Sequence, residues 1–189
     1  MNNDTLTLYH VGFYKLPHPD IHFGRKNADF GQGFYLSPDE QFVKRWARSQ
    51  RGFDTYINKY ELDTTGLVIK RLERNEEWFD CIFSNRNFKP DGLSQFDVIT
   101  GPVANDTLYD TFGIITSGRL EGSVALALLK LGNEYIQTVI KTQKAADKLR
   151  FISARIMSDE EIASYHNTAA DEEQEYQELF ARELERLSG

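Results

Sequence analysis

Alternating apolar residues near the start of the chain predict a β-strand over residues 5–11. Leu6, Leu8 and His10 share one face of this strand at a period of two, so His10 points the same way as the two leucines. A long loop over 12–32 holds most of the glycine and proline of the first half of the chain. Other runs rich in apolar residues predict strands at 33–36, 54–62, 66–72, 96–100, 134–141 and 150–156, with 54–62 and 66–72 joined by a turn.

Capping residues indicate where helices begin. The segments Ser37–Glu40 and Ser158–Glu161 each have the pattern of a capping box, and Asn75 precedes the apolar face of another helix. Further helical patterns lie between 106 and 121, at 121–131 with Gly132 just beyond the end, and at 143–149.

The order of these elements predicts the fold class and the domain division. Strands and helices are mixed without a regular β-α-β-α alternation, which favours an α+β fold with largely antiparallel strands. We expect one domain at 1–157 and an acidic helical extension at 158–189. The apolar stripe of the extension must be covered by the domain or by another chain, and consists of Tyr176, Leu179, Phe180, Leu184 and Leu187.

Charge and composition exclude several classes of protein. The 22 Lys and Arg residues against 29 Asp and Glu give a net charge of −7, which argues against stable binding of duplex nucleic acid. No apolar run approaches the roughly 18 residues of a membrane-spanning helix, and the N-terminus lacks a secretory signal pattern. Cys81 is the single cysteine, which fits a reducing compartment. We therefore expect a cytoplasmic protein without membrane contact.

Most familiar catalytic and metal-binding motifs are missing from the sequence. There is no phosphate-binding loop, no pair of CxxC motifs and no nucleophile elbow. His18 and His22 lie four residues apart, but Pro19 between them indicates an exposed loop, so we expect no metal site.

A set of short motifs carries a resemblance to a known family. The two strongest are the segments 8–12 (LYHVG) and 29–37 (DFGQGFYLS). The supporting segments are 41–47, 60–62, 77–79, 85–86, 97–106 (DVITGPVAND) and 137–142. Over roughly residues 5–155, the chain resembles a bacterial domain family of poorly defined function that is similar to the ADP-ribosyltransferase superfamily, in the branch with a His-Tyr-Glu catalytic pattern. The resemblance implies a split β-sandwich of largely antiparallel strands with peripheral helices.

The resemblance also implies a reaction and its residues. Such enzymes take NAD+ as substrate, release nicotinamide and pass the ADP-ribosyl group to a nucleophile. His10 matches the histidine that bonds the adenosine ribose, and Tyr35 matches the tyrosine that stacks on nicotinamide. Each could instead be a core side chain. The glutamate position falls on Gln137, which shares a strand face with Tyr135 but brings no charge.

The missing charge leaves the catalytic carboxylate open. It could come from Asp29, Asp106 or Glu134, and Gln137 would then orient the ribose. Arg25, in the loop before the second strand, is a candidate contact for the pyrophosphate, although for this side chain taken alone a solvated surface role is favoured. Gly31 and Gly33 would let a ligand approach the backbone, or simply form a turn. The full set of expected NAD+ contacts is Tyr9, His10, Gly12, Arg25, Asp29, Gly31, Gly33, Phe34, Tyr35 and Asp106.

The sequence therefore predicts an NAD+-dependent mono-ADP-ribosyltransferase with His10, Tyr35 and Gln137 as catalytic residues. The resemblance implies a toxin or phage-conflict effector with an ADP-ribose acceptor of unknown identity and a neutralising protein partner. Two alternatives stay open, a catalytically silent module that binds NAD+ or ADP-ribose and a purely interacting α+β protein. We expect the extension at 158–189 to lie outside the nucleotide site.

Overall fold

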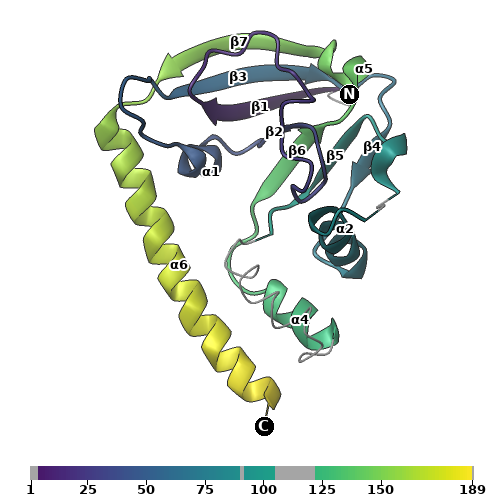
Figure 1. The fold of residues 1–189 in the computed structure, drawn as a ribbon, viewed down its shortest axis with the longest axis vertical. Coiled ribbons are helices and arrows are strands. Elements are labelled where there is room, and N and C mark those ends of the chain that lie inside the picture. The colour runs from purple at the N-terminus through teal and green to yellow at the C-terminus, as the bar shows by residue number, and fades with distance from the viewer. Residues whose placement is uncertain (1–3, 90–91, 105–121, 189) are drawn as a thin grey trace.

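The computed structural model describes residues 4–89, 92–104 and 122–188. Asp106 and the helix predicted between 106 and 121 lie outside these residues. The described chain forms an α+β fold with a three-stranded and a four-stranded sheet (Figure 1). The strands are β1 (Thr5–Gly12), β2 (Phe34–Leu36), β3 (Tyr56–Asp63), β4 (Ile69–Arg71), β5 (Val98–Pro102), β6 (Ile136–Ile140) and β7 (Leu149–Ile156). The helices are α1 (Glu40–Val43), η1 (Lys44–Trp46), α2 (Glu76–Arg86), η2 (Leu93–Gln95), α4 (Gly122–Leu129), α5 (Gln143–Ala146) and α6 (Asp159–Ser188).

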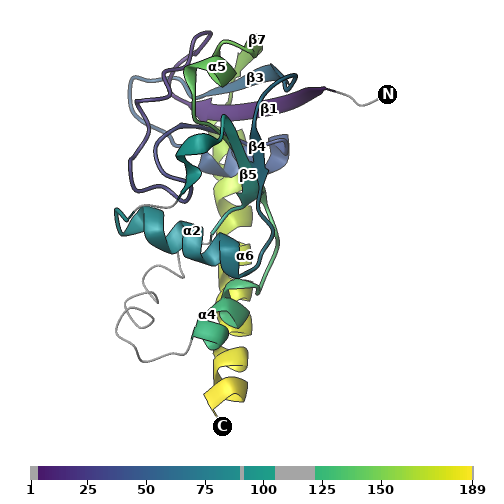
Figure 2. The same cartoon turned by 90° about the vertical axis from the view of Figure 1, so that its right-hand side faces the viewer.

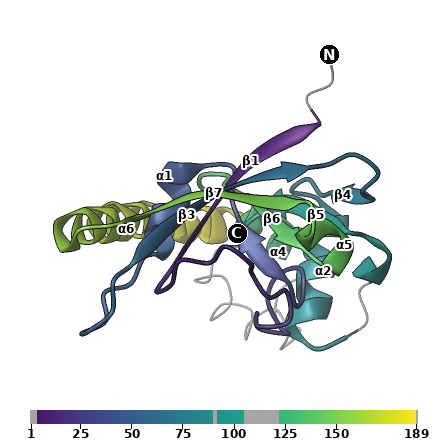
Figure 3. The same ribbon diagram turned by 90° about the horizontal axis from the view of Figure 1, so that it is seen from above.

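The first sheet has the order β1-β3-β7 and is antiparallel throughout. The period-two prediction for β1 is confirmed, because Leu6 and Leu8 pack in one apolar cluster with Tyr60 while His10 contacts Phe34 of the same cluster. Val11 joins a different cluster on the opposite face. Seen from above, this sheet lies over the strands of the second one, with α6 leaving on one side and α2 on the other (Figure 3).

The second sheet has the order β2-β6-β5-β4. Its β2, β6 and β5 strands are antiparallel, whereas β4 runs parallel to β5. The strands expected at 54–62 and 66–72 therefore do not form a hairpin, because β3 belongs to the first sheet and β4 to the second. A single bridge between Tyr9 and Ser37, with backbone bonds of 2.8 and 2.9 Å, joins the two sheets. This bridge sets His10 and Tyr35 near one another.

Of the three helix caps predicted from the sequence, two are confirmed by the structure and one is wrong. Asn75 caps α2 by accepting a hydrogen bond from the Trp78 amide, and the amide of Glu161 donates to Ser158 Oγ at the start of α6. The first helix is capped by Asp39 instead of Ser37. The hydroxyl of Ser37 donates to the carbonyl of Ile136 on β6 and accepts from the amide of Asp39 at 3.1 Å, whereas Asp39 accepts from the amides of the first helical turn.

In Figure 2, α2 lies below β4 and β5, and α6 extends behind these elements toward the C-terminus. The fully buried Trp78 of α2 lies in the same apolar cluster as Ile99 of β5. Tyr176 of α6 joins this cluster, and its hydroxyl donates to the carbonyl of Leu128 on α4 at 3.3 Å. Phe180 and Leu184 also pack against this cluster, so the chain's own domain covers this part of the stripe, whereas Leu179 is exposed and the side chain of Leu187 lies outside the described residues. Within the described residues, no helix combines the length and apolar character that a membrane crossing needs.

Asp97 ties the start of β5 to two other segments. Its carboxylate accepts hydrogen bonds from the Val68 amide, the Thr142 hydroxyl and the Lys144 ammonium at 2.8 to 2.9 Å. These donors, led by the Val68 amide, lower the pKa of Asp97 from 3.8 to about 2. A carboxyl whose pKa is lower in the folded state stabilises the fold above its unfolded pKa, and this contribution disappears as the pH falls through the folded pKa.

We expect Asp97→Asn to lower the free energy of unfolding by about 1 to 3 kcal/mol at pH 7, since an amide accepts these hydrogen bonds less well. The difference from the wild type should shrink as the pH is lowered from about 4 to about 2, where Asp97 itself becomes protonated. Urea unfolding at several pH values measures it, with exposed Asp80→Asn as the control. If the free energies of unfolding of wild type and Asp97→Asn differed as much at about pH 2 as at pH 7, this account would be contradicted.

Candidate functional site

A cavity of about 860 Å³ lies where the loop before β2, the end of α2, β6 and α6 come together. Its size falls in the range of small-molecule sites. Arg25, Asp29, Tyr35 and Gln137, four of the residues predicted from the sequence, line it. Its other charged and aromatic lining residues are Phe42, Arg45, Trp46, Arg48, Arg74, Arg86, Tyr135, His166, Glu172, Glu173, Glu175 and Tyr176.

Tyr35 stands on β2 with its hydroxyl fixed by the preceding loop. The hydroxyl donates to the carbonyl of Gly31 at 2.7 Å and accepts from the amide of Phe30 at 3.0 Å. Burial raises the pKa of the Tyr35 phenol, so the group stays protonated and keeps its donor role at neutral pH. The half-buried ring is therefore held in one orientation at the cavity wall.

His10 supports Tyr35 through the main chain. Its Nδ1 lies 2.8 Å from the carbonyl oxygen of Tyr35, and its ring centroid lies 4.6 Å from that of Phe34. Because a carbonyl can only accept, Nδ1 carries the proton. Burial lowers the pKa of His10, which leaves the ring neutral with Nε2 as an acceptor. The side chain of His10 adjoins the cavity's Tyr35 without lining the cavity itself.

Asp29 is a buried carboxylate at the centre of a polar network. Arg86 at the end of α2 donates to Asp29 Oδ1 from Nε at 2.7 Å and from a second guanidinium nitrogen. On the other oxygen, Oδ2, the amide of Ala104 donates at 3.1 Å and Gln137 Nε2 at 2.8 Å. Both oxygens of the buried carboxyl group thus have hydrogen-bond donors, as burial of a polar group requires.

The amide of Gln137 has a defined orientation in this network. Its Nε2 contacts Asp29 Oδ2 and, at 3.4 Å, the carbonyl of Pro102, and both of these atoms are acceptors. The nitrogen must therefore face them, which leaves Oε1 with no donor among the described residues. A glutamate at this position would bring a second carboxylate against Asp29. Glutamine fits for this reason, and the carboxylate beside it is that of Asp29.

The two glycines before β2 have a different role from the expected ligand approach. Gly31 adopts a left-handed φ of +72°, and a Cβ there would lie 2.7 Å from Asn85 Oδ1 of α2. At Gly33 a Cβ would lie 2.5 Å from a methyl carbon of Val139 on β6. Both glycines let the loop pack against its own chain. Neither glycine lines the cavity, so the close packing of the loop explains why glycine occurs at these two positions.

Three further predicted contacts, Tyr9, Gly12 and Phe34, lie outside the cavity lining. Tyr9 faces away from His10 and packs with Val11 in a separate cluster, which follows from the alternation of a strand. Gly12 and Phe34 border His10 instead of the cavity.

Helix α6 forms one wall of the cavity, which differs from our expectation that the extension lies apart from the site. Arg45 of η1 donates to Glu172 of α6 with two guanidinium nitrogens, and Tyr135 donates to the same carboxylate at 2.8 Å. Sequence reasoning missed Arg45, Tyr135 and Glu172 as site residues. The signal that could have found them is charge, since the extension carries ten acidic residues against two arginines while the rest of the chain is nearly neutral.

Comparison with known proteins places most of the chain in one family. A family model described as "Protein of unknown function (DUF3990)" matches residues 6–151. No curated protein and no solved structure gives a significant match. The matched region ends before α6, so the wall that α6 contributes to the cavity lies outside it.

We expect Asp29→Ala to lower the free energy of unfolding by about 3 to 5 kcal/mol, because it leaves the guanidinium of Arg86 without its counterion. The double variant Asp29→Ala/Arg86→Met should recover part of this loss. Denaturant unfolding of the wild type, the two single variants and the double variant gives the coupling free energy between Asp29 and Arg86. Glu61→Ala, which breaks an exposed pair with Arg150, is the control and should cost less than about 1 kcal/mol. Additive effects of the two changes would contradict a coupled buried pair.

Proposed function

The chain belongs to the DUF3990 family, and we propose that it is a mono-ADP-ribosyltransferase that uses NAD+ as its substrate. The observation that carries the proposal is the buried carboxylate of Asp29, hydrogen-bonded to Gln137 in the same cavity as the fixed ring of Tyr35. An aromatic face, a ribose-orienting amide and a carboxylate are what the cleavage of a positively charged nicotinamide riboside requires.

Tyr35 supplies the aromatic face. The nicotinamide ring of NAD+ carries a positive charge, and a cation over an aromatic ring is stabilised by about 0.5 to 2 kcal/mol. The hydrogen bonds from the hydroxyl to the loop keep the ring from rotating away. Tyr35 thus orients the leaving group before reaction.

Asp29 and Gln137 act on the nicotinamide ribose. Oε1 of Gln137, which accepts no hydrogen bond from the described residues, is suited to accept one from a ribose hydroxyl. In the reaction the bond between ribose C1′ and the nicotinamide nitrogen breaks, and the electron pair leaves with nicotinamide. The cationic ribose that forms is stabilised by the negative charge of Asp29. The acceptor then bonds to C1′ and loses its proton to solvent.

Two further residues complete the proposed site. His10 is a positioning residue: it holds the strand segment of Tyr35 through its hydrogen bond to the Tyr35 carbonyl and does not itself line the cavity. Arg25 is exposed at the cavity and makes no ion pair within the described residues, so it is available for a phosphate.

The alternative is a module that binds NAD+ or ADP-ribose without reaction. The observation that favours it is the engagement of both Asp29 oxygens by Arg86, Gln137 and Ala104, which neutralises much of the charge that catalysis needs. Binding and transfer experiments separate the two functions.

We expect Tyr35→Ala to weaken NAD+ binding by about 1 to 3 kcal/mol, because the stacking surface is lost. Tyr35→Phe keeps the ring face and should bind much more tightly than Tyr35→Ala. Isothermal titration calorimetry measures both. Exposed Tyr14→Ala is the matched control and should leave the affinity unchanged. Equal affinities for wild type and a folded Tyr35→Ala would remove Tyr35 from the site.

We expect the wild type to transfer label from adenylate-labelled NAD+ to a macromolecule in a cell lysate, and Gln137→Ala to lower the rate about 100-fold or more. NAD+ affinity should change little, because Gln137 acts mainly on the transition state. NAD+ labelled on nicotinamide is the control and should give no labelled product. Binding without transfer by the wild type would support the silent module, and neither binding nor transfer would contradict both functions.

A further inference from the structure

The ion pair between Arg45 and Glu172 is the basis of an inference about how the cavity takes its ligand. Arg45 NH2 lies 2.6 Å from Glu172 Oε1, and a second guanidinium nitrogen contacts the other oxygen. The same guanidinium lies over the ring of Tyr135, 4.5 Å from its centroid, and Phe42 stacks on that ring at 4.4 Å. The fork of Arg45 is thus held rigidly in the cavity wall and presents two parallel donors.

Charge is distributed unequally between the two walls. The five arginines that line the cavity belong to the domain at 1–157. The glutamates of the lining belong to α6. Residues 158–189 carry ten acidic and two basic side chains, a net charge of −8, which leaves 20 basic and 19 acidic side chains in residues 1–157. The net negative charge of the whole protein therefore comes from residues 158–189. Without α6 the cavity would be strongly positive, as a site for a polyanionic ligand requires.

Among the cavity arginines, Arg45 forms an ion pair with Glu172 of α6. Arg86 is bound by Asp29 within the domain, and Arg74 donates to carbonyl groups after α4, including that of Asn133 at 2.8 Å. These two are structural. The carboxylate on Arg45 comes from outside the family-matched region.

We propose that Arg45 forms an anion subsite for the pyrophosphate of a dinucleotide, and that Glu172 fills this subsite within the chain until the ligand displaces it. A guanidinium fork binds two oxygens of a phosphate as it binds two oxygens of a carboxylate. The inference rests on the proposed function in one respect, the identification of the ligand as NAD+. The anion subsite itself follows from the Arg45 contacts.

The position of Arg45 suits this ligand. The guanidinium stacks on Tyr135, and Tyr135 and Gln137 are two residues apart and both line the cavity. Two residues of an extended strand span about 7 Å. In NAD+ a single methylene group joins the nicotinamide ribose to the pyrophosphate. A ribose at Gln137 therefore places a phosphate within reach of Arg45.

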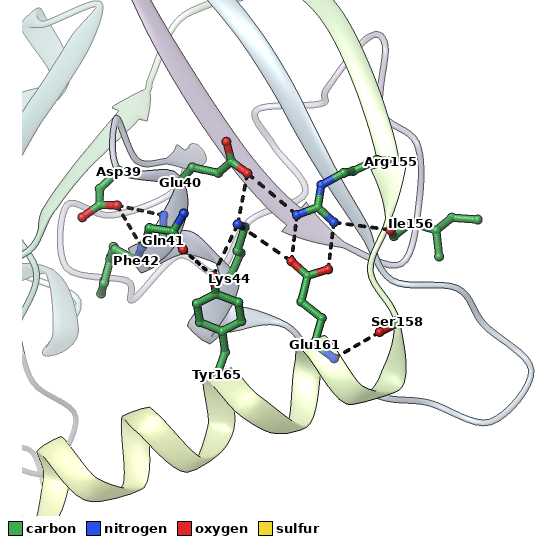
Figure 4. Close-up of polar contacts among 10 residues, drawn as sticks. All are labelled: Asp39, Glu40, Gln41, Phe42, Lys44, Arg155, Ile156, Ser158, Glu161 and Tyr165. Atoms are coloured by element: carbon green, nitrogen blue, oxygen red, sulfur yellow. Dashed lines mark hydrogen bonds and ion pairs between the residues drawn. The ribbon is translucent and has the colours of Figure 1, made fainter.

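The exchange needs only a rotation of the Glu172 side chain, because α6 is anchored on both sides of Glu172. Near its start, Glu161 forms a two-bond ion pair with Arg155 at 2.7 and 2.8 Å (Figure 4). The buried ammonium of Lys44 lies 3.8 Å from Glu161 and 3.4 Å from the hydroxyl of Tyr165. Farther along, Tyr176 is buried against α4. The helix therefore stays in place as the cavity wall while one carboxylate gives way.

The experiment measures binding of inorganic pyrophosphate and of NAD+ to the full chain by isothermal titration calorimetry. Glu172→Gln keeps the shape of the side chain and still accepts from Tyr135, but removes the competing charge. We expect it to bind both probes about tenfold more tightly than wild type. Glu178→Gln, an exposed glutamate of the same helix outside the cavity lining, is the matched control and should change neither affinity.

A second variant tests Arg45 directly. Arg45→Gln in the Glu172→Gln background should abolish the gain, because the fork is gone. Glu172→Asp, one methylene shorter, keeps the charge but withdraws it from Arg45 and should give an intermediate affinity even if Glu172→Gln folds poorly. Circular dichroism and thermal unfolding establish that each variant is folded.

The outcomes distinguish this inference from the proposed function. Unchanged or weaker pyrophosphate binding by Glu172→Gln overturns the subsite, even if NAD+ binds and reacts. Unchanged binding with lost transfer also overturns it, because Glu172 would then act on the reacting atoms. Tighter pyrophosphate binding by a chain that neither binds nor consumes NAD+ supports the subsite and contradicts the proposed function.

Discussion

The burial of one carboxylate organises the site. Asp29 lies in a loop without regular structure and is 7% exposed, so its charge must be met by donors from the protein. The donors are Arg86 at the end of α2, Gln137 on β6 and the amide of Ala104 after β5. Each donor belongs to a different segment. The requirement to satisfy Asp29 therefore fixes the loop, the helix and the sheet relative to one another, and the cavity exists where they meet.

The same loop connects Asp29 to the two sheets. It donates and accepts the hydrogen bonds that hold the Tyr35 hydroxyl, and the main chain of Tyr35 in turn binds His10 of the other sheet. The sheets are joined nearby by the Tyr9 and Ser37 bridge. A substitution at Asp29 would therefore alter the positions of Tyr35 and His10 through these hydrogen bonds. In the proposed reaction this rigidity is useful, because preorganised groups need no rearrangement as charge develops.

The sequence alone was sufficient where structure depends on near neighbours. The alternation of Leu6, Leu8 and His10 predicts the face of β1, and the cap at Asn75 predicts the start of α2. Gly132 has the left-handed φ of +74° expected of a residue after a helix, although α4 ends at Leu129, two residues earlier than predicted. These features arise within a few residues of chain, where side-chain period and local hydrogen bonds decide the conformation. The α+β class and the candidates Tyr35 and Asp29 at the cavity follow from the same local patterns together with the family resemblance.

The tertiary structure decided which of these residues meet. Gln137 and Asp29 are 108 positions apart, and only the packing of β6 against the loop shows that the amide of Gln137 lies against the carboxylate of Asp29. Ser37 has the sequence of a helix cap, but its hydroxyl binds Ile136, 99 residues away. The local sequence pattern also did not predict that α6 forms a wall of the cavity. The sequence by itself determined the elements and the chemistry that each one carries. The assembly of a carboxylate, an amide and an aromatic ring into one site was decided by the need to satisfy buried polar groups across distant segments, which no local pattern encodes.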